Sequence, residues 1–258
     1  MTSLIITLPS GTADPAALLN YLSGADARSL TTVALGNLAA PADRQAEVVA
    51  VVPAQRLSWH RVQLPQGSVT RSMLGERSNT RLRAILEGLL EDHLLDEPAQ
   101  LHFALQPQPE AGAPVWVAVC DRAWLKAGLE ALARTGHVVS RIVPECTPQA
   151  LQQAIQVAGE GDAAELTAWV GAADGSSGGV LNCALTPAAL GLLGPVGAQR
   201  PVLAEPAVAA QAEQCFKRPV QLQQRGQRLL QAAQSDWDLA QFDLANAARR
   251  QAWGQVAQ

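Results

Sequence analysis

Two nearby stretches of sequence organise the whole chain: "EVVAVVPAQRLSWHRVQLPQG" at residues 47–67 and "RLRAILEGLLEDHLLDEPAQLHFAL" at residues 81–105. The first opens with β-branched residues that indicate a strand, and a proline ends it because proline has no N–H to donate to a ladder. Residues 57–64 alternate between two mixed faces, as a second strand would. Residues 100–105 resume a strand pattern. Residues 81–95 have the apolar spacing of one helix face, at positions 82, 85, 86, 89, 90 and 94.

Composition is that of an ordinary globular protein. Hydrophobic residues make up 48% of the 258 residues and charged residues 16%, which is typical of a chain that buries a core. The net charge is −4 and no cluster of Lys or Arg stands out, so no nucleic-acid partner is expected. The N-terminus lacks the features of a signal peptide, and no apolar run reaches about 18 residues, so this chain by itself is not expected to span a membrane.

The cysteines and histidines do not form a recognisable site. The four cysteines are far apart and have no metal-ligand spacing, so we predict no metal site and expect buried free thiols in a reducing cytoplasm. The four histidines are scattered, and no Ser–His–Asp or Cys–His pairing can be read. We therefore predict no catalytic residue.

A short match to a hydrolase motif has a plainer explanation. Residues 175–179 read Gly-Ser-Ser-Gly-Gly and match the letters G-x-S-x-G of the nucleophile elbow. That elbow needs a helix after it, whereas the strand-like Val180 and Leu181 follow here. A turn is therefore favoured at these residues. An unrelated α/β hydrolase remains an alternative function, which activity against a panel of esters would reveal.

A family resemblance rests on the two opening runs. The phrase "VVPAQRLSWHRVQLPQG" at residues 51–67, followed by "RLRAILEGLLEDHLLDEPAQLHFAL", resembles the cytoplasmic part of protein L of the type II secretion system, an inner-membrane assembly factor of Gram-negative bacteria. It includes residues that do not interchange readily, such as Trp59 and His60, and a weaker resemblance covers nearly the whole chain. The resemblance implies a mixed α/β (α+β) fold: a degenerate actin-like ATPase (RNase H-like) fold with an inserted small subdomain.

Strand and helix signals divide the chain into parts. Residues 138–143 read as a strand whose nearest partner in sequence is the strand at 48–52. A helix is predicted from Thr147 to Val157, the glycines of residues 159–162 indicate a boundary, and Asp14–Pro15 is expected to open a short helix. The expected parts are a first actin-like half (1–55 with 137–158), an inserted strand–helix–strand–strand–helix subdomain (56–136), a second half (160–235) and a membrane-proximal tail (236–258).

The fold that the resemblance implies holds a nucleotide between its halves. In catalytic members, an Asp-Gly hairpin near the N-terminus of each half binds phosphates and a metal ion. The first should follow strand one, but residues 8–12 carry no acid, and Pro9 lacks an N–H that phosphate would use. The second is expected at residues 171–179, with Asp174 as its single acid. We therefore expect no cofactor and no enzymatic activity; an actin-like nucleotide-binding protein with weak ATPase activity is the alternative.

The resemblance also implies partners. It implies a non-catalytic component of the assembly platform, which recruits the secretion ATPase through that enzyme's N-terminal domain and links it to the membrane complex for protein export. Proteins M and F of the system are further implied partners, and a homodimer is left open. We place the ATPase contact on the exposed side of the helix at 81–95, since its apolar side (Leu82, Ile85, Leu86, Leu89) is needed for the core. The expected contact residues are Arg83, Glu87, Glu91, Asp92, Asp96 and Glu97.

Two features keep more than one interpretation. Acids at the end of a helix oppose its macrodipole, and they suit a solvated face as well as a charged lip for a partner. Residues 236–258 lack a core pattern, which fits a frayed tail. The family, however, has a transmembrane helix after its cytoplasmic part, so that Arg249 and Arg250 resemble a positive-inside flank. This implies a location at the cytoplasmic face of the bacterial inner membrane, in a full-length protein with a single membrane span.

Overall fold

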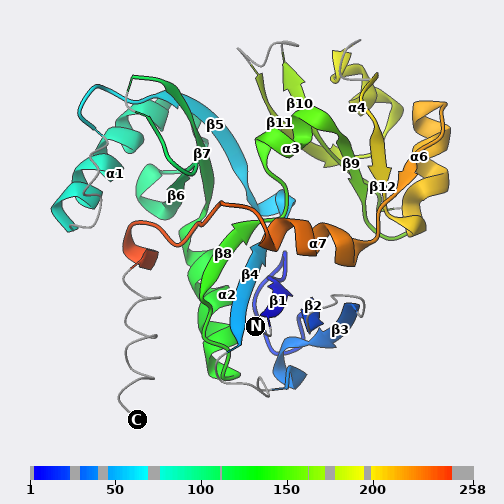
Figure 1. The fold of residues 1–258 in the computed structure, drawn as a ribbon, viewed down its shortest axis with the longest axis horizontal. Coiled ribbons are helices and arrows are strands. Elements are labelled where there is room, and N and C mark those ends of the chain that lie inside the picture. Colours follow the sequence, from blue (N-terminus) through cyan, green and yellow to red (C-terminus); the bar gives the residue numbers. More distant parts are fainter. Residues whose placement is uncertain are drawn as a thin grey trace. The chain divides into compact units, whose positions relative to one another are not determined.

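The chain folds into two compact units, which Figure 1 traces in sequence order. Unit 1 comprises Met1–Pro144 and Ala232–Gln258, and unit 2 comprises Glu145–Gln231. The computed structural model describes residues 3–23, 30–39, 46–68, 76–110, 112–161, 163–171, 178–194 and 199–245.

Unit 1 contains a five-stranded sheet. Its strands are β1 (Ser3–Thr7), β2 (Leu18–Ser23), β3 (Leu30–Ala34), β4 (Glu47–Val52) and β8 (Arg141–Pro144), with the 3-10 helices η1 (Leu35–Asn37) and η2 (Ala54–Arg56). The order is β3-β2-β1-β4-β8, with β4 parallel to both β1 and β8, and β2 antiparallel to both β1 and β3. The valine-rich run of β4 is buried almost throughout, because β-branched side chains pack well on a pleated surface. The predicted pairing of the strand near residue 140 with that near residue 50 is therefore confirmed.

A smaller sheet is inserted between β4 and β8. Its elements are β5 (Ser58–Gln63), α1 (Glu76–Leu90), η3 (Glu91–His93), η4 (Pro98–Gln100), β6 (Leu101–Leu105), β7 (Pro114–Asp121) and α2 (Arg122–Arg134). The three strands are antiparallel in the order β5-β7-β6. Asp121 caps α2 by accepting a hydrogen bond from the backbone N–H of Trp124. Apart from the two 3-10 helices, these elements follow one another as strand, helix, strand, strand and helix.

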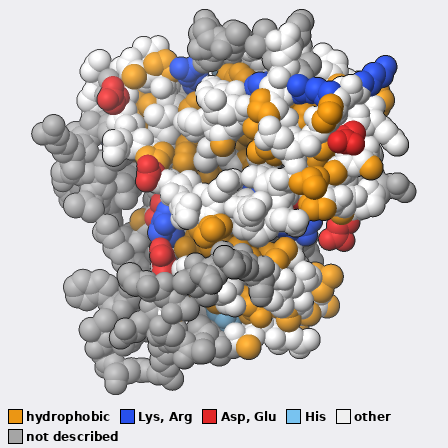
Figure 2. All heavy atoms as spheres, turned by 45° about the vertical axis from the view of Figure 1, so that its right-hand side comes forward, with side chains coloured by type: hydrophobic (Ala, Val, Ile, Leu, Met, Phe, Trp, Pro, Cys, Tyr) orange, Lys and Arg blue, Asp and Glu red, His pale blue; other side chains and the backbone are white. Residues whose placement is uncertain are grey.

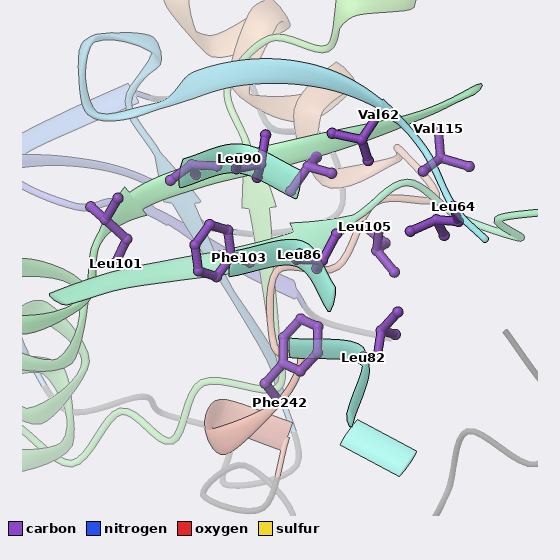
Figure 3. Packing of buried hydrophobic residues seen from close by; sticks show 12 residues of the cluster. Val62, Leu64, Leu82, Leu86, Leu90, Leu101, Phe103, Leu105, Val115 and Phe242 are labelled. Carbon is purple, nitrogen blue, oxygen red and sulfur yellow. The ribbon is translucent and has the colours of Figure 1, made fainter. Parts of the chain in front are cut away.

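The core of this inserted part lies between α1 and its sheet. Leu82, Leu86 and Leu90 are four residues apart, so they share one face of α1, and each is at most 2% exposed. They pack with Phe103 of β6, which is fully buried. Figure 3 shows these side chains together with Phe242, which joins the same cluster from the C-terminal part of the chain.

Unit 2 repeats the sheet topology of unit 1. Its elements are α3 (Pro148–Gln153), β9 (Ile155–Ala158), β10 (Glu165–Gly171), β11 (Gly178–Ala184), α4 (Pro187–Gly191), β12 (Val202–Ala204), η5 (Pro206–Val208), α6 (Ala209–Phe216), β13 (Gln221–Leu222) and α7 (Arg225–Ala233), whose last two residues belong to unit 1. The order is β11-β10-β9-β12-β13, with β10 antiparallel to both β9 and β11, and β12 parallel to both β9 and β13. Strand by strand, β9 corresponds to β1, β10 to β2, β11 to β3, β12 to β4 and β13 to β8.

Two of the predicted helices are corrected by this topology. The helix expected to reach Val157 ends at Gln153, and residues 155–158 form β9, the first strand of the second sheet. Ile155 and Val157 are buried whereas their neighbours are half-buried, which is the alternation of a strand. The compact units accordingly divide after Pro144, so that residues 145–158 fall in unit 2 instead of the first half. The helix expected after Asp14–Pro15 is likewise wrong at residues 18–23, which form β2.

The C-terminal segment is not a frayed tail over residues 236–245. Its apolar side chains Trp237, Leu239, Phe242 and Leu244 are between 1% and 7% exposed. Trp237 meets Trp59 of β5 edge-on, with ring centroids 5.0 Å apart, and the backbone N–H of Leu239 donates to the carbonyl of Ile142. These residues therefore belong to the core of unit 1. Arg249 and Arg250 lie outside the described residues.

The surface view adds one observation on charge. On the face in Figure 2, the described Asp and Glu side chains are scattered and do not form one patch, and some lie beside Lys or Arg side chains. Within the described part of the chain, no helix is both long enough and apolar enough to cross a bilayer.

Candidate functional site

Two of the six expected contact residues, Arg83 and Glu87, already make contacts within unit 1. The Arg83 guanidinium donates to the carbonyls of Pro98 (3.3 Å) and Leu101 (3.0 Å), and it lies 5.3 Å from the ring centroid of Phe103. It also forms an ion pair of 2.9 Å with Glu87, one helical turn away. Arg83 therefore fastens α1 to η4 and β6, and Glu87 fixes Arg83. Both residues have a structural role that their sequence positions did not predict.

The four remaining acids form an exposed group, here called the acidic segment: Glu91, Asp92, Asp96 and Glu97. All lie between the end of α1 and the start of β6, the first two in η3. Among the described residues, none of the four has an ion-pair partner. Glu91 and Asp92 directly follow the last turn of α1, where negative charge opposes the macrodipole at a cost of about 0.3–1 kcal/mol for each exposed charge. Folding alone therefore does not favour these two acids.

Apolar side chains accompany the acidic segment. Leu89, which was predicted to belong to the core, is 36% exposed, and Leu95 is fully exposed between the two pairs of acids. Ile85 is only half-buried. The reason is that α1 contributes to the core only Leu82, Leu86 and Leu90, which are spaced four residues apart. The sequence prediction also included the apolar residues three positions after Leu82 and Leu86. The result is a surface that combines exposed leucines with exposed acidic side chains.

The first phosphate-type hairpin, between β1 and β2, is tied down through its carbonyls. The indole N–H of Trp124 is within 3.2 Å of the Pro9 carbonyl and 3.1 Å of the Gly11 carbonyl. The guanidinium of Arg56 donates to the carbonyl of Ser10 and lies 5.2 Å from the Trp124 ring centroid. The positive charge of Arg56 therefore stabilises the backbone of this loop.

The second hairpin is not where the sequence placed it. Since β9 and β10 correspond to β1 and β2, the equivalent hairpin is the loop at residues 159–164, and the turn at 171–179 instead joins the second and third strands of that sheet. Asp174 lies outside the described residues. The loop begins with Gly159 at φ +125°, a conformation that favours glycine, and its N–H donates to the carboxylate of Glu205 at 3.3 Å.

Glu205 stands in a buried ion cluster that the sequence did not predict. It is 4% exposed and directly follows β12. Arg225 donates to both of its carboxylate oxygens (2.9 and 2.8 Å), and Arg228 to one (2.6 Å). Burial alone would raise the pKa of Glu205, but the hydrogen bonds from Arg225 and the charge of Arg228 outweigh it and lower that pKa. The partners are 20 or more residues apart in sequence, so no local motif announces them.

Comparison with known proteins follows from this geometry. A family model described as the type II secretion system protein L matches residues 25–154, half of the chain. The chain belongs to the protein L family. It is therefore a component of the type II secretion system, and interaction with other components of that system follows from membership. A comparison with curated protein sequences found no match.

Solved structures resemble this protein L family member in fold. The cytoplasmic domain of EpsL, an inner membrane component of the type II secretion system of Vibrio cholerae, is 20% identical, with a TM-score of 0.58 over 93% of this chain and 98% of that one. The PilM–PilN type IV pilus biogenesis complex matches with 11% identity and a TM-score of 0.43 over 88% of this chain and 89% of that one. The mixed α+β architecture with its repeated five-stranded sheet is the actin-like ATPase fold that the resemblance implied.

In the part of this protein L that the structure describes, the remaining polar groups do not form a metal centre. Among the described residues, no group of three or more His, Cys, Asp or Glu side chains could hold a metal ion. Cys120 and Cys146 are buried free thiols. Burial, together with the neighbouring acids Asp121 and Glu145, raises the pKa of each thiol to about 12, so both stay protonated and poorly reactive.

Proposed function

We propose that this protein L is a non-catalytic component of the assembly platform that recruits the secretion ATPase. In this proposal it acts at the cytoplasmic face of the bacterial inner membrane and links the ATPase to the membrane complex for protein export. Family membership supports the setting. The observation that carries the recruiting role is the acidic segment, because its four acids are exposed and two of them, Glu91 and Asp92, stand where the helix dipole disfavours negative charge.

The acidic segment and its leucines define the chemistry of the partner surface. A partner for Glu91, Asp92, Asp96 and Glu97 needs basic side chains, and one for Leu89 and Leu95 needs an apolar patch among them. We propose that the N-terminal domain of the secretion ATPase presents such a surface. Charges at the rim of an interface act mostly on the association rate, whereas apolar anchors slow dissociation.

Charge reversal tests this contact. The variant Glu91→Lys/Asp92→Lys/Asp96→Lys should capture the ATPase N-terminal domain at least about tenfold more weakly than the parent, because each attraction becomes a repulsion. Its melting temperature should stay equal to that of the parent or rise slightly, since lysine suits a helix C-terminus. Biolayer interferometry and thermal unfolding on the same samples provide both quantities.

A matched control separates the site from the net charge. Glu110→Lys/Glu213→Lys/Asp236→Lys makes the same change in net charge at exposed acids outside the acidic segment. It should bind the ATPase domain as the parent does. Equal capture by the parent and both variants would rule out the acidic segment as the contact.

The proposed absence of catalysis rests on the two hairpins. The loop between β1 and β2 is held by Trp124 and Arg56, and the N–H of Gly159 in the loop between β9 and β10 is held by Glu205. A ligand that binds only the folded state must raise the melting temperature. Since we expect this protein not to bind Mg-ATP, we expect Mg-ATP to leave its melting temperature unchanged. A saturable rise at micromolar Mg-ATP, with release of phosphate, would instead favour the alternative of a nucleotide-binding protein with weak ATPase activity.

The remaining parts of the proposal concern architecture and further partners. We propose that the two five-stranded sheets are the two actin-like halves and that residues 56–136 are the inserted subdomain, with the second half starting at residue 145. Proteins M and F of the system and a second copy of this chain are the further proposed partners. Co-purification of tagged full-length protein from detergent-solubilised membranes checks each of these contacts.

A further inference from the structure

The carboxylate of Glu205 has the surroundings of a bound oxyanion. Its two oxygens accept hydrogen bonds from Nε and Nη2 of the Arg225 guanidinium, from Arg228 and from the backbone N–H of Gly159. An arginine fork combined with the N–H of a glycine in a tight loop is the donor set with which proteins hold phosphate groups. Here a side chain of the same chain supplies the anion.

The position of this carboxylate in the sheet supports the same interpretation. β9 and β12 are parallel neighbours, with Val157 beside Ala204, so Gly159 and Glu205 follow the same edge of the sheet. Open sheets of this kind bind their ligands outside the carboxyl ends of parallel strands. Gly159 also opens the loop that corresponds to the first hairpin of unit 1.

The arginines need an anion at this place. Arg228 is 5% exposed, and although burial alone would lower its pKa, Glu145 and Glu205 outweigh that effect and raise the pKa. Arg228 shares its charge between these two carboxylates, at 2.9 and 2.6 Å. Arg225 has Glu205 as its close partner and the exposed Glu160 at 3.5 Å. Without Glu205, the half-buried Arg225 would lose its close partner, and the buried Arg228 would keep only Glu145.

We propose that Glu205 is a built-in ligand of an oxyanion site formed by Gly159, Arg225 and Arg228, and that removal of its side chain opens this site to inorganic phosphate. The proposal rests on the non-catalytic role given above, for which it supplies a physical basis. A carboxylate that occupies the site permanently orders unit 2 without an external phosphate.

Thermal unfolding of the full chain in phosphate tests the site. Glu205→Ala should melt below the parent in chloride, and phosphate at about ten times its dissociation constant should raise its melting temperature by about 2–4 °C over chloride of equal ionic strength. The parent should not respond to the exchange of chloride for phosphate. Glu205→Asp, which keeps the charge, should also not respond, and Glu205→Ala/Arg225→Ala should lose the response.

Two outcomes would overturn the proposal. One is an equal response of Glu205→Ala and the parent to phosphate. The other applies if Glu205→Ala does not accumulate in folded form: the denatured variant is then diluted into phosphate or chloride, and equal recovery in both would overturn the proposal, whereas higher recovery in phosphate supports it. Since neither assay contains the secretion ATPase or ATP, failure here leaves the recruiting role unaffected.

Discussion

At the scale of single residues, charges are used in two opposite ways. Glu205 is buried, paired and held by four hydrogen bonds, whereas the acids of the acidic segment are exposed and, within the described residues, unpaired. Removing one partner of a buried ion pair costs about 3–5 kcal/mol, because the other charge loses its compensation. Exposed charges contribute little to folding. The first kind therefore serves stability and the second is free to serve recognition.

Acid should weaken the buried cluster selectively. Because the folded-state pKa of Glu205 lies below its ordinary value of 4.5, its contribution to the free energy of unfolding is full above pH 4.5 and is lost as the pH falls through the lowered pKa. Glu205→Gln should be less stable than the parent at neutral pH, and this difference should shrink in acid. Urea unfolding of both proteins across the pH range measures it. A difference that does not change with pH would contradict the pairing.

Residue roles were the part of the site least open to prediction. Arg83 was expected to face a partner because its position is on the polar side of α1, yet its contacts are with carbonyls 15 and 18 residues further along the chain. A helical pattern gives the direction of a side chain but not the elements that fold against it. The acids after α1 were predictable as exposed because charged side chains are rarely buried without a partner.

At the scale of elements, length and periodicity separated right predictions from wrong ones. β4 and α1 were predicted because each repeats its pattern over six or more residues. β9 has only four residues and β2 is rich in leucine, which suits helices and strands alike. The segment 236–245 looked polar, and its four apolar side chains follow neither helix nor strand spacing. The structure has no regular secondary structure over residues 237–241, so no periodic pattern could have predicted their burial. Tertiary contacts alone bury them.

Truncation of Phe242 should show that this segment is part of the core. Phe242 is 7% exposed and packs in the cluster of Figure 3, so Phe242→Ala should lower the free energy of unfolding by about 3–5 kcal/mol. Phe242→Leu keeps most of the apolar volume and should cost less than half as much. Urea unfolding measures both variants. A loss of less than about 1 kcal/mol for the alanine variant would mean that the segment is only loosely attached.

At the scale of the whole molecule, the two sheets share one topology without a sequence repeat. The equivalence lies in strand order and direction, which arise from backbone pairing, and many different side chains are compatible with it. For this reason the glycines at 159–162 were read as a boundary, although they begin a hairpin inside the second sheet. The family phrase at residues 51–67 identified the fold more reliably than any count of strands.

The recruiting role is most directly measured through association kinetics with the N-terminal domain of the secretion ATPase. For the parent, the association rate constant should fall by about tenfold between low and physiological salt, because screening shortens the reach of the acidic segment. For Glu91→Lys/Asp92→Lys/Asp96→Lys, the rate at low salt should be lower and should rise with salt. Stopped-flow or interferometry measurements give both curves. The same rate and the same salt dependence for the two proteins would contradict the proposal that the acidic segment recruits the ATPase.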